Sequence, residues 1–165
     1  MPSKVKTEAI EDADRFRQST WFSGVPVDPV TIARRSGVAV VYAPLDTETL
    51  GAFLKKPDGT PTILINQDDP ENRKRFTCAH ELGHYNRRKD REGEDHRIDL
   101  RSPLSATGSD PEEVYANEFA ASLLMPADDL KIFLQFGLSD QELADRFKVS
   151  REAMEYRIVN LFVPS

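Results

Sequence analysis

The sequence predicts an α+β fold in which a small three-stranded sheet lies against a long helix and is followed by C-terminal helices. Three short segments rich in apolar and β-branched residues lie within residues 38–66, which is the pattern of strands. Asp-Pro pairs at residues 28–29, 69–70 and 110–111 each combine a helix-capping side chain with a proline at the first helical position. Beyond residue 126 the pattern is helical throughout.

The first 66 residues hold two helices and the three strands. Polar stretches with scattered apolar positions predict a surface helix over residues 7–20 and a second helix from Pro29 to Ser36. The strands are expected at residues 38–43, 50–54 and 62–66. The first of them is apolar along its length and is expected to be buried. The other two flank Pro57-Asp58-Gly59, a turn signal, and therefore predict a hairpin.

The middle of the chain predicts two helices joined by a long loop. The first helix is expected to be capped by Asp69 and to run to about Lys89, and the second to run from Asp110 to Met125. Residues 90–110 are polar and contain Pro103 and Gly108, which predicts a loop without secondary structure. A loop of that length in a compact domain is usually functional or mobile.

The C-terminal segment has the rhythm of a helix-turn-helix unit. Ser139 and Glu142 form a capping-box pattern, and Val149-Ser150 marks a short turn before a last helix. We therefore expect a domain over residues 1–126, in which residues 1–24 are an N-terminal extension. Residues 127–165 are expected to form a helical subdomain packed on it.

Composition narrows the class of protein. The chain has 165 residues, 39% of them hydrophobic, which suits one domain with a small appendage. The formal net charge of −6 argues against a generic binder of nucleic acid or of anionic membranes. One cysteine, Cys78, excludes an intramolecular disulfide, and no signal peptide or membrane span is visible. We expect a soluble cytoplasmic protein without a membrane partner.

The strongest chemical signal is His80-Glu81-Leu82-Gly83-His84 on the predicted long helix. Four residues of α-helix are about one turn, so the two imidazoles project from one face and can reach one ion. Zinc is bound by imidazole and carboxylate ligands, and a catalytic site keeps one position for water. Glu81 lies beside the first histidine, where its carboxylate can accept a proton from that water. Glycine is costly inside a helix, so Gly83 indicates a close approach.

Two histidines do not complete a metal site, and the residues leave three candidates for the third ligand. Asp90 follows His84 by six residues, the spacing of a third ligand in a longer peptidase motif, although that motif has glycine where Arg87 stands here. His96 lies in the polar loop. Glu113 lies on the next helix with Asn117 four residues later on the same face, so that one could bind metal and the other orient a histidine.

Two longer motifs carry a family resemblance. Both resemble motifs of the ImmA/IrrE family of metallopeptidases. The first motif precedes His80 and reads Arg75-Phe76-Thr77-Cys78-Ala79. The second follows the histidines and reads Glu113-Val114-Tyr115-Ala116-Asn117-Glu118-Phe119-Ala120-Ala121-Ser122-Leu123-Leu124-Met125-Pro126. The resemblance covers roughly residues 25–162. It implies a zincin-like, gluzincin-type domain that binds Zn²⁺, with Mn²⁺ or Fe²⁺ as alternatives. His80, His84 and Glu113 would be the metal ligands, Glu81 the general base, and Asn117 a residue that supports the ligands.

The resemblance also implies a substrate and a way to bind it. The family includes regulators of phage immunity and of the radiation stress response, and its targets are helix-turn-helix repressors whose cleavage relieves repression. The repressor is expected to be a separate polypeptide. In such peptidases an extended substrate pairs with a strand beside the site, here the edge expected at Thr62–Asn66, which includes Ile63, Leu64, Ile65 and Asn66. The candidates to stabilise the oxyanion are Tyr85, His96, Tyr115 and Tyr156.

Other functions remain open at this stage. A regulator that docks to a repressor or to DNA without catalysis would carry the same metal motif. Residues 139–161 carry five acidic and four basic residues, so a last helix with Glu152 and Glu155 would repel phosphates, which argues against direct DNA binding. Cys78 could be a redox-sensitive thiol close to the metal, but a buried core cysteine is the commoner case.

Overall fold

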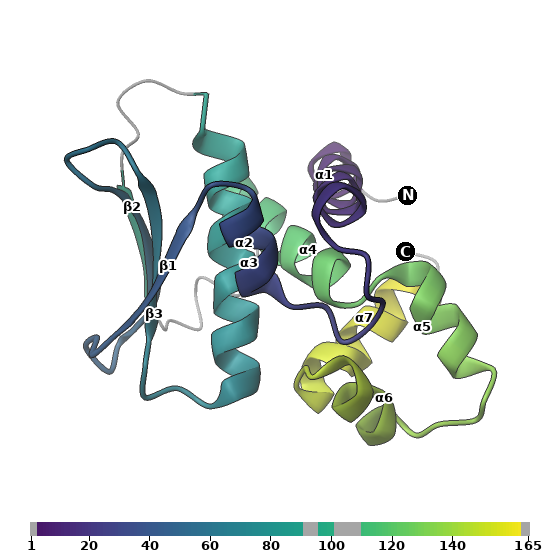
Figure 1. Ribbon diagram of the computed structural model, residues 1–165. Helices are drawn as coiled ribbons and strands as arrows, with labels where there is room; N and C mark the ends of the chain where they lie inside the picture. Colours follow the sequence, from purple (N-terminus) through teal and green to yellow (C-terminus); the bar gives the residue numbers. More distant parts are fainter. Residues whose placement is uncertain (1–2, 91–95, 101–109, 163–165) are drawn as a thin grey trace.

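The computed structural model describes residues 3–90, 96–100 and 110–162, with side chains for all of these except 96–100. A sheet lies on one side, α2 and α3 cover one of its faces, and α4 and α1 follow behind them (Figure 1). The elements in chain order are α1 (Lys4–Thr20), α2 (Pro29–Arg35), β1 (Ala39–Ala43), β2 (Thr49–Lys55), β3 (Pro61–Asn66), α3 (Glu71–Arg88), β4 (His96–Leu100), α4 (Pro111–Leu124), α5 (Ala127–Leu134), α6 (Asp140–Phe147) and α7 (Arg151–Phe162). The predicted α+β class is confirmed.

The sheet has four described strands in the order β1-β3-β2-β4, one more than the sequence predicts. The hairpin of β2 and β3 is confirmed as an antiparallel pair. The fourth strand, β4, corrects the prediction that residues 90–110 are loop throughout. It pairs antiparallel with β2, and its last four residues, Arg-Ile-Asp-Leu, alternate polar and apolar residues.

Two further strand predictions are wrong because strand order depends on distant segments. β3 lies inside the sheet, bonded to β1 on one side and to β2 on the other, so the backbone of Ile63, Leu64, Ile65 and Asn66 has no open edge for a substrate. β1 is an edge strand and is not buried along its length, since Val41 is 38% and Tyr42 43% exposed. The described edges are therefore β1 and β4.

The helix starts follow the capping signals, with one exception. Asp28 and Asp110 each accept a hydrogen bond from the backbone two residues ahead, with proline at the first helical position. Ser139 and Glu142 form the predicted capping box. Asp69 does not cap α3, because the cap residue is Pro70 and no side-chain cap bond is present there. The long helix otherwise spans the predicted range.

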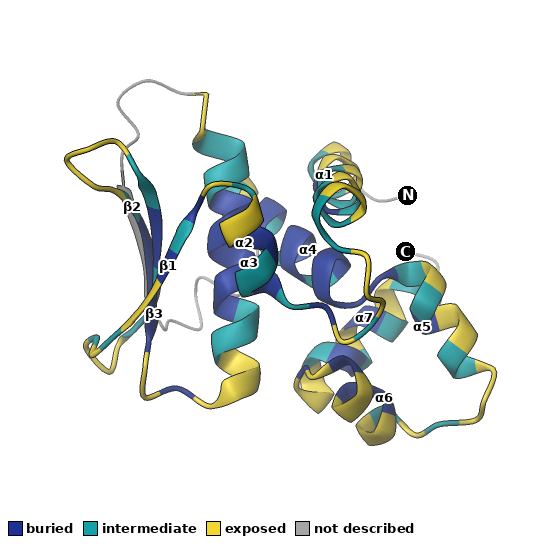
Figure 2. Cartoon of the chain, in the orientation of Figure 1, coloured by how far each residue is buried: buried dark blue, intermediate teal, exposed yellow. Residues whose placement is uncertain are grey.

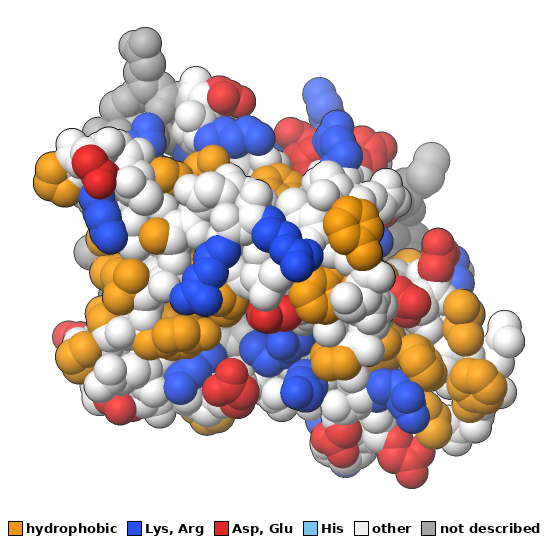
Figure 3. Space-filling model, in the orientation of Figure 1, with side chains coloured by type: hydrophobic (Ala, Val, Ile, Leu, Met, Phe, Trp, Pro, Cys, Tyr) orange, Lys and Arg blue, Asp and Glu red, His pale blue; other side chains and the backbone are white. Residues whose placement is uncertain are grey.

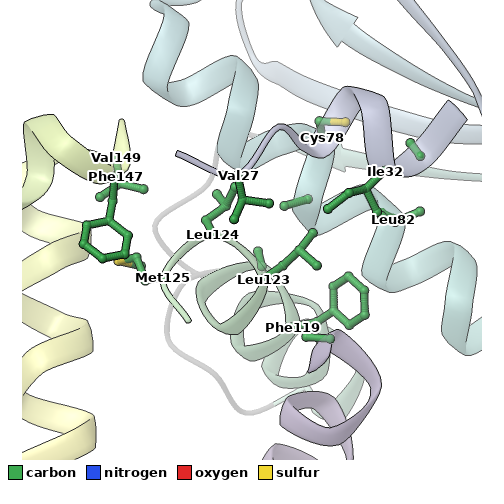
Figure 4. Close-up of a cluster of buried hydrophobic side chains, with 14 of the residues drawn as sticks. Val27, Ile32, Cys78, Leu82, Phe119, Leu123, Leu124, Met125, Phe147 and Val149 are labelled. Atoms are coloured by element: carbon green, nitrogen blue, oxygen red, sulfur yellow. The ribbon is translucent and has the colours of Figure 1, made fainter. Parts of the chain in front are cut away.

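The core lies between the sheet, α3 and α4 and continues into the C-terminal helices (Figures 2 and 4). Leu82 of α3, Leu123 and Phe119 of α4 and Ile32 of α2 are fully buried and belong to one hydrophobic cluster. Cys78 is part of the same cluster, and burial raises the pKa of its thiol well above the ordinary value. The thiol therefore stays protonated, which agrees with a core residue and not with a reactive one.

The N-terminal and C-terminal helices are both attached to α4. Arg17 of α1 donates a hydrogen bond to the carbonyl of Ser122, and Ala9 and Ala13 bury the inner face of α1. Arg157 of α7 is buried, donates from Nε to the carbonyl of Met125, and lies 3.6 Å from the carboxylate of Glu118. α6 and α7 follow each other with a short connection. The helix-turn-helix character of this segment and the domain boundary at residue 126 stay predictions.

Candidate metal centre

Helix α3 brings the two histidines of the motif to the same side, as their spacing predicts. His84 is fully buried and His80 is 9% exposed, and their ring centroids are 4.7 Å apart. The Nε2 atoms of the two rings are 3.1 Å apart, so both nitrogens point toward one position. Phe76 packs near the ring of His80, one turn earlier on the helix.

Glu113 of α4 completes the group. Its Oε2 lies 3.3 Å from Nε2 of His80, and its Oε1 lies 3.1 Å from Nε2 of His84. Ligands placed tetrahedrally at about 2.0–2.1 Å from one zinc ion lie about 3.3–3.4 Å from one another, so the three residues fit such an ion. Two imidazoles and a carboxylate also suit manganese and iron. Among the described side chains, these three form the group close enough to hold a metal.

Glu81 lies on the same helix as the two histidines, directly after His80, and is fully buried. A Cβ added at Gly51 of β2 would lie 3.6 Å from Cγ of Glu81, so the side chain of Glu81 lies against the inner face of the sheet. His80 and Glu113 are also buried, so the whole group is largely shielded from solvent. The role of Glu81 as a general base stays a prediction.

Gly83 lets α4 approach α3 closely enough for Glu113 to reach the histidines. A Cβ at this position would lie 3.2 Å from the Cα of Ala116 and 3.1 Å from a ring carbon of Phe119. The first of these contacts is with helix backbone and cannot be relieved by a side-chain rotation. The close approach that the sequence indicates for this glycine is therefore an approach between the two helices that carry the ligands.

Of the other two candidate ligands, Asp90 lies away from the histidines, and the side chain of His96 is not described. Asp90 is exposed, beyond the end of α3, and does not belong to the described metal-binding group. His96 begins β4, where its backbone is paired opposite Leu54, and its side chain lies outside the described residues. Asn117 is half-buried one turn after Glu113 on α4, and its supporting role stays a prediction.

Tyr115 belongs to a structural network and not to the metal site. Its hydroxyl donates to Asp12 of α1 at 2.6 Å and accepts from Asn86 of α3 at 2.8 Å. Arg87 lies over its ring at 4.7 Å and also pairs with Glu112. Burial first, and then the Asp12 carboxylate, raise the pKa of this hydroxyl. These contacts favour a structural role for Tyr115, because its hydroxyl proton is donated to Asp12 of α1.

The remaining tyrosine candidates are not joined to the metal centre by the contacts described. Tyr85 contacts the ring of Phe53 at 5.7 Å and lines a groove beside α1. Tyr156 lies on α7 and is 65% exposed. The network of Asp12, Asn86 and Tyr115 was missed from the sequence, since its members lie up to 103 residues apart and no local pattern connects them.

A helix that presents two histidines and a glutamate, completed by a carboxylate from a second helix and covered by a small sheet, defines a metallopeptidase-like domain. The chain belongs to the family of IrrE N-terminal-like domains, Peptidase_M78, whose model matches residues 33–159. The family resemblance seen in the sequence is thereby confirmed. The family match and the metal-binding group together indicate a metallopeptidase-like or IrrE-like regulator.

Among solved structures, the chain is similar in fold to a Mycobacterium tuberculosis transcriptional regulator, with a TM-score of 0.68 and 18% sequence identity. The match covers 96% of this chain and 48% of that regulator, so this chain spans about half of the regulator's length. No curated protein matches the chain. Within the described residues, no helix has the length and apolar character needed to cross a bilayer.

Proposed function

We propose that the protein is a metal-dependent endopeptidase of the cytoplasm that cleaves a regulatory protein, namely a helix-turn-helix repressor encoded separately, and so relieves repression. The observation that carries the proposal is the convergence of His80, His84 and Glu113 within 3.1–3.3 Å, with Glu81 on the same helix. Zn²⁺ is the proposed ion. The family and the description of the structural neighbour as a transcriptional regulator support a regulatory role.

The chemistry follows from the placement of Glu81. A divalent ion bound at such a site polarises the scissile carbonyl and lowers the pKa of a bound water toward 7. The Glu81 carboxylate takes the proton of the attacking water and passes it to the leaving nitrogen of the substrate. Its burial between α3 and β2 keeps bulk water away from this proton transfer.

The strand order β1-β3-β2-β4 also determines where a substrate chain can pair with the sheet. An extended chain can add to a sheet only at a free edge, and β3 has none. Of the two edge strands described, β4 is the one that pairs with β2, and β2 is the strand that contacts α3 beside Glu81. We therefore assign the substrate-pairing edge to β4 in place of β3.

Docking without catalysis is the second candidate function, favoured by exposed apolar side chains at the C-terminal end. Phe136, Tyr156 and Val159 are 68%, 65% and 52% exposed. DNA binding through the same helices has less support. Arg157 of α7 is buried against α4, and acidic and basic side chains are interspersed over these helices on the face in Figure 3.

The variant Glu81→Gln separates the two candidates. We expect it to bind metal as the wild type does, because Glu81 is not one of the three converging ligands. Cleavage of a purified helix-turn-helix repressor should fall by about 10²–10⁴-fold, the usual contribution of a general base. The measurements are metal content by elemental analysis and cleavage by gel electrophoresis. If Glu81→Gln relieves repression in cells as well as the wild type does, the docking function is correct and the peptidase function is not.

A further inference from the structure

Gly51 of β2 occupies a place where no side chain fits. A Cβ there would lie 2.6 Å from Cγ2 of Thr77 and 2.8 Å from the carbonyl oxygen of Leu64. Gly24, Gly37, Gly59 and Gly137 have positive φ angles, but Gly51 does not. Glycine is therefore needed at this position because there is no room for a side chain, and not because the backbone adopts a special conformation.

The strand is irregular at the same point. Thr49 pairs with Leu100 and Gly51 with Asp99, so Leu50 is an extra residue on the β2 side of the pairing with β4. Such a bulge bends the strand and increases its local twist. The bend and the glycine together lay the backbone of β2 against the turn of α3 that runs from Thr77 to Glu81, both of which are buried.

This contact has two consequences for the site. The backbone of Gly51 is one wall of the space that holds the side chain of Glu81. Gly51 is also paired directly with β4, so β4 moves together with β2. The distance between β2 and α3 therefore determines the distance from the β4 edge to Glu81 and His80 of α3. A side chain at position 51 would widen this distance without touching Glu113, which approaches from α4 on the other side of α3.

We propose that Gly51, with the bulge at Leu50, is a positioning residue that sets the distance between Glu81 and the β4 edge, and thereby allows an extended peptide to lie beside the metal centre. The inference rests on the proposed peptidase function. It predicts that a substitution at position 51 affects the binding of a peptide chain and leaves the metal ligands intact.

The test compares two probes on the zinc-loaded protein by calorimetry. Acetohydroxamate reports the metal alone, and the tripeptide hydroxamate Pro-Leu-Gly-NHOH reports the metal and the strand edge together. We expect the wild type to bind the tripeptide probe at least about tenfold more tightly, as one or two strand hydrogen bonds would provide. In Gly51→Ala this preference should disappear, while zinc content and acetohydroxamate affinity stay at the wild-type level.

A reciprocal change in size tests that the contact itself is responsible. Thr77→Ser removes the methyl group that the new alanine would meet, so Gly51→Ala/Thr77→Ser should recover part of the preference and of the thermal stability. Gly83→Ala serves as the contrasting variant, because its added methyl group faces α4 and should weaken zinc binding instead. If Gly51→Ala does not fold, the double variant is compared with the wild type, and its preference should be lower than that of the wild type because the contact with the carbonyl oxygen of Leu64 remains.

Three results would overturn the inference: an unchanged preference in Gly51→Ala, no preference in the wild type, or a folded double variant that recovers nothing. Failure of the peptidase function gives a different result. The tripeptide probe would then keep its Gly51-dependent preference while Glu81→Gln and the wild type show the same lack of cleavage.

Discussion

Glu113→Gln is expected to lose metal affinity by more than about 100-fold, because replacing even a supporting partner of a metal ligand costs about 10–100-fold and Glu113 is a proposed ligand itself. Glutamine keeps the size of the side chain but removes the negative charge of the carboxylate, whose Oε1 lies 3.1 Å from His84 and whose Oε2 lies 3.3 Å from His80. Zinc affinity is measured by competition with a chromophoric chelator, and circular dichroism checks that the fold is retained.

Glu112→Gln is the matched control for this variant. Glu112 is the preceding residue on the same helical turn. Its carboxylate lies 3.4 Å from Arg87 and 3.8 Å from Arg88, and it does not belong to the metal-binding group found among the described residues. Its replacement should leave zinc affinity within about twofold of the wild type, since distant charge changes at a surface are weak. Equal affinities for Glu113→Gln and Glu112→Gln would mean that the third ligand lies elsewhere, and His96 would be the next residue to test.

Arg157→Met is expected to lower the free energy of unfolding by about 3 kcal/mol, the cost of leaving a buried partner without its counter-charge. The change removes the hydrogen bond to the carbonyl of Met125 and leaves the carboxylate of Glu118, itself 9% exposed, beside a thioether. At this chain length the loss corresponds to a fall of about 6–12 °C in Tm. Urea and thermal unfolding measure both quantities.

Arg151→Met provides the comparison on the same helix. Arg151 is paired with Glu155 at 2.8 Å, but its side chain is 62% exposed. Exposed pairs of this kind contribute about 0.2–1 kcal/mol. The buried arginine, and not the exposed one, attaches α7 to the helix that carries Glu113. If both variants were equally stable, α7 would not depend on Arg157 for its attachment, and the argument against its role in DNA recognition would fail.

Much of the site could be predicted because its geometry is local. The spacing of His80 and His84 places both rings on one face of any helix, and the structure adds only the distances. Glu113 lies 29 residues beyond His84, on a different helix. Local spacing therefore left three candidates, and only the packing of α4 on α3 brings Glu113 to the histidines.

The errors arose where distant segments decide the outcome. The sheet order places β1 and β2 on the two sides of β3, and no pattern within residues 62–66 reveals that both of its edges are taken. Tyr115 is a residue type that can stabilise an oxyanion, but its hydroxyl donates a hydrogen bond to Asp12, 103 residues away in the chain. Gly51 looks like an ordinary glycine until the helix that excludes its side chain is in place.

The central claim is that His80, His84 and Glu113 bind one ion together, and X-ray absorption at the zinc edge of the loaded protein tests it most directly. The account predicts one zinc per chain with two imidazole nitrogens and oxygen ligands at about 2.0–2.2 Å. His84→Ala should remove the ion. A protein that binds no zinc after reconstitution, or a zinc shell without imidazole scattering, would contradict the account.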